Sequence, residues 1–385
     1  MTRMLALSAD DPGLDAAVER MLAGGRAVAP VPIDPQAAAS TMAMLRPDEP
    51  LAEPDAGLIV GTSGSTGQPK GVVLSRAAIR SGVAATHHRL GGPGTWTLAV
   101  PAHYVAGIMV IARAVAAGTT VFRARPDLGD LPRGQLSDSG QRHYLSLVPT
   151  QLVRALDQPK VTDALGHYDA ILLGGAAADP GLLERAAAAG LTVVTTYGMS
   201  ETSGGCVYDG VPLDGVSIGL GAEAGRVTIA GPVVFSGYRL RPDLTAEVLR
   251  SGPEGGVLLT RDRAEWVGTP DGKQYLRVLG RIDDVVISGG VNVDLAAVEA
   301  ALKDLDPHAV AIGVPDPEWG TRIIAALTIP ITLAAVRQTL HTLEPAARPR
   351  GLLRHPHLPH TSSGKIDRQE LIAWWHAGPA EKEVL

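Results

Sequence analysis

The stretch Leu58-Ile59-Val60-Gly61-Thr62-Ser63-Gly64-Ser65-Thr66-Gly67-Gln68-Pro69-Lys70-Gly71-Val72-Val73-Leu74 places a loop of glycines and hydroxyls between two apolar triplets. The triplets predict two buried strands. The glycines allow backbone N–H groups to converge on an anion, the hydroxyls add donors, and Lys70 adds a positive charge. A flexible surface linker is the alternative, but linkers are seldom bracketed by strand-like triplets. We therefore predict a polyphosphate-binding loop. The residues expected to contact the phosphates are Thr62, Ser63, Gly64, Ser65, Thr66, Gly67 and Lys70.

The composition of the chain excludes several classes of protein. A formal net charge of −6 argues against a nucleic-acid-binding protein, which usually carries a basic patch. The single cysteine, Cys206, excludes an internal disulfide framework and a cysteine-rich zinc site. The longest apolar window, residues 105–118, is too short to span a bilayer and contains Arg113. The amino terminus has too short an apolar stretch for a signal peptide, so we expect a soluble cytoplasmic protein.

Strand and helix patterns alternate through the first half of the chain, which indicates an α/β fold with a parallel sheet. Ser75 is expected to cap a helix that extends to about Leu90, whereas residues 30–56 show little strand signal. Short strands from about residue 211 suggest a β-rich subdomain, and the part beyond residue 285 reads as a compact α+β unit. We therefore expect a large N-terminal domain of layered helices and sheets over residues 1–280, a hinge at 281–284 and a small C-terminal domain over 285–385.

Five further segments, spread along the chain, carry glycines, hydroxyls and charged side chains. They are Gly174-Gly175-Ala176-Ala177, Thr196-Tyr197-Gly198-Met199-Ser200-Glu201-Thr202, Thr260-Arg261-Asp262, Gly280-Arg281-Ile282-Asp283-Asp284 with Ser288-Gly289-Gly290-Val291-Asn292, and Leu358-Pro359-His360-Thr361-Ser362-Ser363-Gly364-Lys365-Ile366-Asp367-Arg368. Read singly, they are compatible with a plain turn, a solvated carboxylate or a polar linker. In this order, and together with the loop, they resemble the acyl-adenylate-forming superfamily of acyl-CoA synthetases, adenylation domains and firefly-type luciferases.

This resemblance implies a site for ATP and magnesium. Tyr197 would stack on adenine, and Glu201 would hold Mg²⁺, a hard cation that prefers carboxylate oxygen. Ser200 stands where the superfamily usually has threonine, but it keeps the hydroxyl that contacts the α-phosphate. Asp262 would accept hydrogen bonds from the ribose hydroxyls, although Arg261 replaces the usual glycine before it. The other nucleotide-binding residues that the resemblance implies are Gly174, Gly175, Ala176, Gly198, Met199, Thr202 and Arg281.

The later segments imply a mobile C-terminal domain. Lys365 would bridge the attacking carboxylate and the α-phosphate during adenylation, as preorganised charge at the transition state. Asp283 matches the hinge residue about which the small domain swings. Gly289 and Gly290 would let the chain pass close to the pantetheine arm of coenzyme A. The catalytic residues implied by the resemblance are Lys365, Glu201 and Ser200.

Two segments, 101–113 and 146–152, resemble o-succinylbenzoate–CoA ligases of menaquinone synthesis more closely. Their substrate is an aromatic dicarboxylate whose ring carboxylate needs a polar partner. A cation in an apolar helix is costly unless it is paired, so Arg113 is the expected partner, with a structural ion pair as the alternative. Tyr104 stands where these ligases usually have histidine. The candidate acyl-substrate residues are His103, Tyr104, Arg113 and Ser146.

The predicted activity is a Mg-ATP-dependent ligase reaction in two steps, with acyl-AMP as the intermediate and coenzyme A as the acceptor. Alternatives are an acyl-CoA synthetase for another aryl or medium-chain acid, an adenylation enzyme that loads a carrier protein, and an inactive nucleotide-binding module. The expected partners are small-molecule substrates, with no nucleic acid and no integral membrane association. The sequence is compatible with a homodimer.

Overall fold

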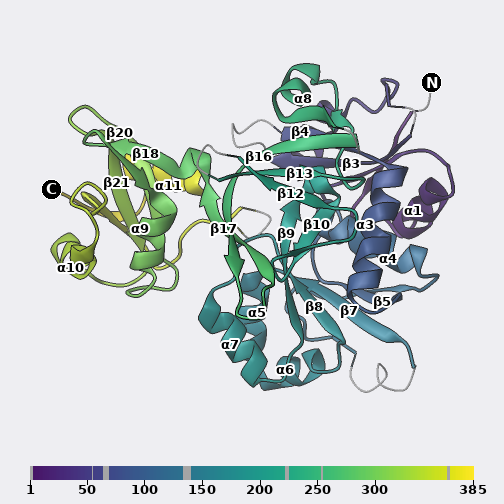
Figure 1. Ribbon diagram of the computed structural model, residues 1–385, viewed down its shortest axis with the longest axis horizontal. Helices are drawn as coiled ribbons and strands as arrows, with labels where there is room; N and C mark the ends of the chain where they lie inside the picture. Colours follow the sequence, from purple (N-terminus) through teal and green to yellow (C-terminus); the bar gives the residue numbers. More distant parts are fainter. Residues whose placement is uncertain are drawn as a thin grey trace. The chain divides into compact units, whose positions relative to one another are not determined.

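The chain folds into two units, each with its own hydrophobic core (Figure 1). The computed structural model describes residues 3–53, 55–63, 69–132, 140–221, 225–252, 255–361 and 365–385. The larger unit comprises residues 1–219, 227–260 and 266–277, and the smaller unit comprises residues 220–226, 261–265 and 278–385. The smaller unit therefore includes two short segments from earlier in the chain as well as the C-terminal part.

The predicted phosphate loop joins two neighbouring strands of a five-stranded sheet. The strands, in spatial order, are β1 (Leu5–Ser8), β2 (Val28–Val31), β3 (Ala56–Ser63), β4 (Pro69–Ser75) and β14 (Gly237–Tyr238). β1, β2 and β3 run parallel, whereas β4 is antiparallel to both β3 and β14. The two apolar triplets, 58–60 and 72–74, are fully buried in β3 and β4, which confirms the predicted pair of strands.

A seven-stranded sheet forms the centre of the larger unit. Its spatial order is β11 (Val211–Pro212), β10 (Gly204–Tyr208), β9 (Val193–Met199), β8 (Ala170–Leu173), β7 (Arg142–Leu147), β5 (Gly94–Leu98) and β6 (Val121–Arg123). The five strands from β9 to β6 run parallel, as the alternating pattern predicts. Successive residues of a strand point to opposite faces, so Tyr144 and Leu145 of β7 face different layers.

Helices cover both faces of this sheet. Leu145 and Leu147 belong to a core shared with α5 (Pro149–Leu156), α6 (Pro159–Leu165) and α7 (Pro180–Ala188). On the other face, Trp96 of β5 contacts Tyr144 with ring centroids 4.9 Å apart. That face is covered by α3 (Arg76–Arg89) and α4 (Val105–Ala116), whose side chains reach Trp96. The larger unit is therefore a layered α/β structure.

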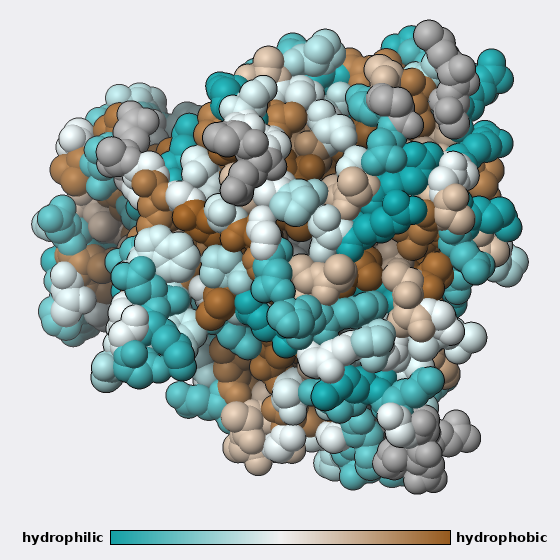
Figure 2. Space-filling view, turned by 45° about the vertical axis from the view of Figure 1, so that its right-hand side comes forward, coloured by the Kyte–Doolittle hydropathy of each residue, from teal (hydrophilic) through white to brown (hydrophobic). Residues whose placement is uncertain are grey.

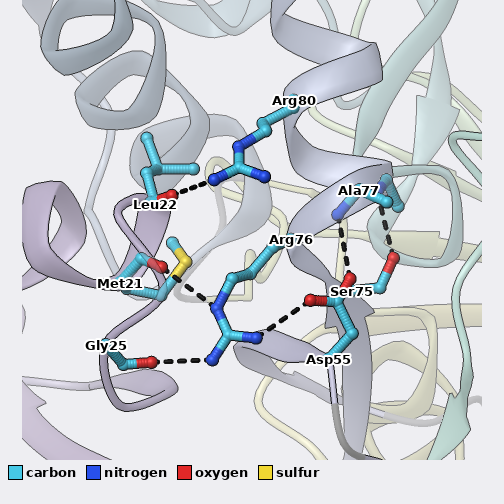
Figure 3. Close-up of polar contacts among 9 residues, drawn as sticks. Met21, Leu22, Gly25, Asp55, Ser75, Arg76, Ala77 and Arg80 are labelled. Atoms are coloured by element: carbon cyan, nitrogen blue, oxygen red, sulfur yellow. Dashed lines mark hydrogen bonds and ion pairs between the residues drawn. The ribbon is translucent and has the colours of Figure 1, made fainter.

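The amino-terminal segment is tied to the base of α3 by arginines (Figure 3). Ser75 caps α3 as predicted, since its Oγ accepts a hydrogen bond from Ala78 N at 3.0 Å. Arg76 donates to the carbonyl oxygens of Met21 (3.1 Å) and Gly25 (2.7 Å), which lie at and beyond the end of α1 (Leu14–Leu22). These bonds join the end of α1 and the turn after it to the start of α3.

A helix that the sequence reading missed follows β2. Residues 30–56 contain α2 (Pro35–Leu45), and Asp34 is its N-cap residue. The Asp34 carboxylate accepts a hydrogen bond from Ala37 N at 2.8 Å, and Pro35 occupies the first helical position. Both are ordinary helix-start signals, so the prolines of this region begin a helix rather than prevent one.

The predicted β-rich region is a five-stranded sheet. It contains β12 (Ser217–Leu220), β13 (Arg226–Ala230), β16 (Gly255–Gly268), β15 (Leu249–Gly252) and β17 (Gln274–Arg281), with β17 paired to β16. The short helix α8 (Pro242–Val248) precedes β15. β16 is thus much longer than the short strands predicted for this region.

The smaller unit is an α+β structure, as expected for the end of the chain. Its sheet contains β19 (Val291–Asp294), β18 (Val285–Ser288), β21 (Gly320–Leu327), β22 (Gly351–Arg354), β23 (Glu381–Val384) and β20 (Val310–Asp316), which pairs with β21. Alternate residues of the central strands enter two cores. One core includes α9 (Leu295–Leu302) and α10 (Leu333–Thr339), and the other includes α11 (Arg368–Ala377).

Apolar and polar side chains intermix on the face shown in Figure 2. Among the described residues, no helix is long and apolar enough to cross a membrane. The apolar helix α4 instead lies inside the larger unit, where eight of its residues are buried; these are Gly107, Ile108, Met109, Val110, Ile111, Ala112, Arg113 and Ala114.

Candidate active site

The base of the phosphate loop is a regular antiparallel pair. Thr62 lies opposite Lys70, and the Thr62 hydroxyl donates to the Lys70 carbonyl oxygen at 3.4 Å. Ser63 is the last residue of β3. The predicted phosphate contacts Gly64, Ser65, Thr66 and Gly67 lie outside the described residues. The structure therefore defines the two strands that flank the loop and the backbone position of Lys70.

Three segments far apart in sequence bring a cation, an aromatic ring and a carboxylate together beside this loop. The Lys70 ammonium lies 5.1 Å from the centroid of the Tyr238 ring. The Tyr238 hydroxyl donates to Glu201 Oε1 at 2.7 Å. Tyr238 belongs to β14, which pairs with Val72 on the strand that carries Lys70. Sequence reasoning identified Lys70 and Glu201 but missed Tyr238, because a two-residue strand has no periodic signal.

The carboxyl ends of β8 and β9 carry the predicted adenine segment. Gly174 N donates to the Leu147 carbonyl at 3.1 Å, and a Cβ atom at Gly174 would lie 2.3 Å from Thr196 Oγ1. Gly175 has a φ of +85°, which disfavours other residues. Ala176 is exposed beyond them. Because β8 and β9 are parallel, these residues and Tyr197 lie at the same edge of the sheet.

A tight turn presents Glu201. Glu201 lies in the 3₁₀ turn η1 (Ser200–Thr202), which directly follows β9. Thr202 is buried, and its hydroxyl accepts from Met199 N at 2.9 Å and donates to the Gly204 carbonyl at 2.7 Å. A Cβ atom at Gly198 would lie 2.2 Å from the Gly204 carbonyl oxygen. In the structure Gly198, Met199 and Thr202 therefore shape the turn, while the Glu201 carboxylate extends to Tyr238.

Glu201 fits a magnesium ion that is shared with a bound polyphosphate. Among the described residues, no three His, Cys, Asp or Glu side chains are grouped so that they could hold a metal by themselves. Magnesium in nucleotide sites usually takes one or two carboxylates and completes its shell with phosphate oxygens and water. A single fixed carboxylate beside a phosphate loop has the chemistry of such a site.

Arg113 is a buried guanidinium on the inner side of α4. It is 3% exposed, and its guanidinium carbon lies 5.0 Å from the Trp96 ring centroid. Among the described residues, Arg113 forms no ion pair with a carboxylate, and its Nε has no hydrogen-bond partner. Two further buried nitrogen atoms close to it, Trp96 Nε1 and His87 Nε2, also lack partners among the residues described. The alternative role of Arg113, a structural ion pair, therefore finds no support among the described residues.

The surroundings of His87 disfavour its protonated form. Burial, reinforced by the positive charge of Arg113, lowers the pKa of His87 to about 4. The imidazole is consequently neutral near pH 7. Among the described residues between α3, α4 and β5, Arg113 therefore keeps a positive charge that no neighbouring side chain neutralises.

The other candidate substrate residues lie on the same layer of the larger unit. Ser146 is buried near the carboxyl end of β7, where it pairs with Leu98 and Leu172. Tyr104 immediately precedes α4, and its ring contacts that of His103 at 4.1 Å. Burial lowers the pKa of His103. Ser146 and Arg113 thus come from a strand and a helix that pack on each other.

In the smaller unit, the predicted hinge residue is fixed by an arginine fork. Arg281 Nε and Nη2 donate to Asp283 Oδ1 and Oδ2 at 2.9 and 2.8 Å. Arg281 Nη1 lies 3.9 Å from Asp262 Oδ1, so the two predicted ribose ligands are neighbours. Burial pushes the pKa of Asp283 upward, but the hydrogen bonds from Arg281 bring it below its ordinary value.

The predicted coenzyme A and lysine segments also lie in the smaller unit. Gly289 and Gly290 have φ values of +59° and +79°, and Gly289 N donates to the Trp319 carbonyl at 2.9 Å. A Cβ atom at Gly289 would lie 2.7 Å from the Trp319 ring. Lys365 is exposed, and its carbonyl accepts from Thr361 N at 2.7 Å. Both segments therefore have defined backbone turns.

Comparison with known proteins defines the class of enzyme. Residues 9–259 match the AMP-binding enzyme family, and the chain belongs to this family. A Mycobacterium tuberculosis protein named probable 2-succinylbenzoate–CoA ligase is 41% identical over 381 residues, which cover 95% of this chain and 96% of that protein. A feruloyl-CoA synthase from Amycolatopsis is 30% identical over 370 residues, which cover 84% of this chain and 71% of the relative.

A solved structure supports the fold. The o-succinylbenzoate CoA synthetase of Bacillus subtilis, in complex with its acyl-adenylate intermediate, superposes with a TM-score of 0.74. The match covers 96% of this chain and 95% of that protein at 22% identity. The fold expected from the sequence resemblance is therefore confirmed over nearly the full chain.

Proposed function

We propose that this chain is an AMP-forming 2-succinylbenzoate–CoA ligase that acts in menaquinone biosynthesis. The reaction class is supported by the Mycobacterium tuberculosis relative, which matches nearly the whole chain at 41% identity. The observation that supports this substrate is Arg113, whose buried guanidinium has no carboxylate partner among the described residues. ATP and coenzyme A are the co-substrates, and the reaction takes place in the cytoplasm.

Arg113 favours a substrate with a second carboxylate. A buried, unpaired charge is strongly unfavourable, so a ligand that neutralises it gains affinity from the removal of that penalty. The planar guanidinium matches a carboxylate through two parallel hydrogen bonds. The ring carboxylate of 2-succinylbenzoate supplies such a partner, and Ser146 on the adjoining strand adds a donor. A monocarboxylic acid would leave the charge bare.

The first chemical step is adenylation. An oxygen of the succinyl carboxylate attacks the α-phosphorus of ATP, and the bond to the pyrophosphate leaving group breaks. The phosphate loop and Lys70 bind the phosphates, while Tyr197 and the glycines at 174 and 175 receive the adenine. Magnesium, held by Glu201, supplies charge neutralisation at the phosphate oxygens when it is bound. Lys365 stabilises the negative charge that moves between the carboxylate and the α-phosphate.

The second step transfers the acyl group. The thiol of coenzyme A attacks the acyl carbon, and AMP leaves with the electron pair of the anhydride bond. Asp283, held by the Arg281 fork, is the hinge that exchanges Lys365 for the turn at Gly289 and Gly290. Enclosing the acyl-AMP during this exchange protects the anhydride from water. Asp262 and Arg281 bind the ribose in both steps.

The competing function is an aryl-CoA synthetase whose acid substrate has no second carboxylate. The similarity to the Amycolatopsis feruloyl-CoA synthase supports this alternative. The two proposals are separated by incubating the protein with ATP, Mg²⁺, coenzyme A and a panel of acids. The panel contains 2-succinylbenzoate, 4-oxo-4-phenylbutanoate, which lacks the ring carboxylate, and ferulate. We expect thioester formation mainly from 2-succinylbenzoate; comparable or faster turnover of ferulate would reject this assignment.

A further inference from the structure

Tyr238 occupies the space between the two charged residues of the nucleotide site. It is 8% exposed, so its hydroxyl requires a hydrogen-bond partner inside the protein. That partner is Glu201 Oε1, at 2.7 Å. The face of the same ring receives the Lys70 ammonium, which lies 5.1 Å from the ring centroid. One side chain therefore contacts both the carboxylate expected to hold magnesium and the lysine expected to hold phosphate.

The Tyr238 ring is itself rigidly held. Its backbone N donates to Thr245 Oγ1 at 2.9 Å, and β14 pairs with β4 through Val72. The Phe235 ring packs edge-on at a centroid distance of 5.0 Å. Phe235 N also donates to the Glu201 carbonyl at 2.9 Å, so the segment that leads to Tyr238 is joined to Glu201 through the backbone as well. The ring is a fixed platform rather than a flexible surface group.

From this geometry we infer that Tyr238 is a positioning residue for the magnesium–nucleotide complex. Its hydroxyl fixes Glu201 Oε1 and thereby orients the other carboxylate oxygen, Oε2, for the metal. Its ring keeps the Lys70 ammonium beside the phosphate loop by a cation–π contact. The inference rests on the proposed function, because it assumes that Glu201 and Lys70 serve a bound Mg-ATP.

The two contacts can be removed separately. Tyr238→Phe deletes the hydroxyl but keeps the ring, so only the Glu201 contact is lost. Tyr238→Leu deletes both contacts. Tyr168→Phe is a matched control, because it also removes a buried tyrosine hydroxyl, one that bonds to Thr97 Oγ1 at 2.9 Å in the core of the larger unit.

The measurement is calorimetric binding of ATP to the full chain, with excess Mg²⁺ and again in EDTA, without any acid or coenzyme A. We expect Tyr238→Phe to weaken Mg-ATP binding about tenfold, the lower end of the loss seen when the partner of a metal-ligating group is removed. In EDTA the same variant should bind ATP within about twofold of the wild type. Tyr238→Leu should weaken binding under both conditions, and Tyr168→Phe under neither.

Several outcomes would overturn the inference. Equal weakening of Tyr238→Phe in magnesium and in EDTA would show a general structural effect, and unchanged binding in both would remove the residue from the site. Thermal unfolding of each variant checks that it is folded, and Tyr238→Phe provides the test even if Tyr238→Leu does not fold. Since no acid is present, failure here leaves the ligase assignment intact, and failure of the thioester assay leaves this result intact.

Discussion

The guanidinium carbon of Arg113 lies 5.0 Å from the centroid of the Trp96 ring, and Arg113 forms no ion pair with a carboxylate in the described part of the chain. An aromatic face offsets only part of the penalty of burying a cation. Under the proposed function, the second carboxylate of the substrate would therefore supply the missing counter-charge.

Replacing Arg113 should change the choice of acid. Removing one partner of a buried charge pair typically costs about 2–5 kcal/mol, so Arg113→Ala should lower kcat/KM for 2-succinylbenzoate by roughly 30-fold or more. Turnover of 4-oxo-4-phenylbutanoate should change little, because this acid has no ring carboxylate. Arg185→Ala, at an exposed ion pair with Asp157, is the control. Equal losses for both acids would assign Arg113 a structural role only.

Replacing Lys365 should separate the two chemical steps. Lys365→Ala should slow acyl-AMP formation by a factor of about 10² to 10³, the usual effect of losing a preorganised charge at a transition state. Thioester formation from supplied acyl-AMP should remain close to that of the wild type. Pyrophosphate exchange measures the first step, and coenzyme A consumption measures the second. Lys382→Ala, on β23, serves as the control, and parallel losses in both assays would contradict the role given to Lys365.

Arg239 should be important for stability rather than for chemistry. It is buried, and its guanidinium donates to four carbonyl groups at the end of α2 and in the segment after it. These carbonyls belong to Leu45, Arg46, Glu49 and Pro50. Arg239→Ala would leave several of these carbonyls unsatisfied, and we expect a loss of about 2–4 kcal/mol in the free energy of unfolding. Urea denaturation measures this loss. The exposed neighbour Arg241, mutated to Ala, should leave the transition unchanged; similar curves for both variants would refute the argument.

His87 should make stability depend on pH below neutrality. Its pKa in the folded protein is lowered to about 4 from an ordinary value of 6.5, so the unfolded chain binds more protons between these values. The contribution of neutral, buried His87 to the free energy of unfolding is full above pH 6.5 and is lost as the pH falls toward 4. His87→Gln should flatten this dependence in denaturation curves recorded from pH 7 to 4.5. An NMR titration of the His87 ring with a midpoint near 6.5 would exclude this explanation.

Elements with a strong local signal could be predicted from the sequence. The buried triplets around the phosphate loop and the Ser75 cap of α3 each depend on neighbouring residues, and both predictions are confirmed. The family motifs are also continuous in sequence, which is why Glu201 and Lys70 could be proposed from the sequence, and their roles stay predictions. A local signal can nevertheless be missed, as the N-cap of α2 at Asp34 demonstrates.

Tyr238 could not be predicted, because its role depends on contacts between distant segments. It meets Glu201 from 37 residues away in the sequence, through a strand only two residues long. The absence of an ion pair at Arg113 in the described part of the chain was equally inaccessible, since a sequence can suggest an ion pair but cannot show which side chains lie within reach. Both features concern which side chains converge after folding.

The parallel pairing of β1 with β2, and of β2 with β3, has a practical consequence for anyone who shortens this protein. A fragment that started at β3 would expose the side of this strand that pairs with β2, with its backbone N–H and C=O groups and the apolar residues around Leu58. Bare strands of this kind recruit other chains and form aggregates. A minimal nucleotide-binding fragment must therefore retain the first thirty or so residues, even though none of them carries a chemical role.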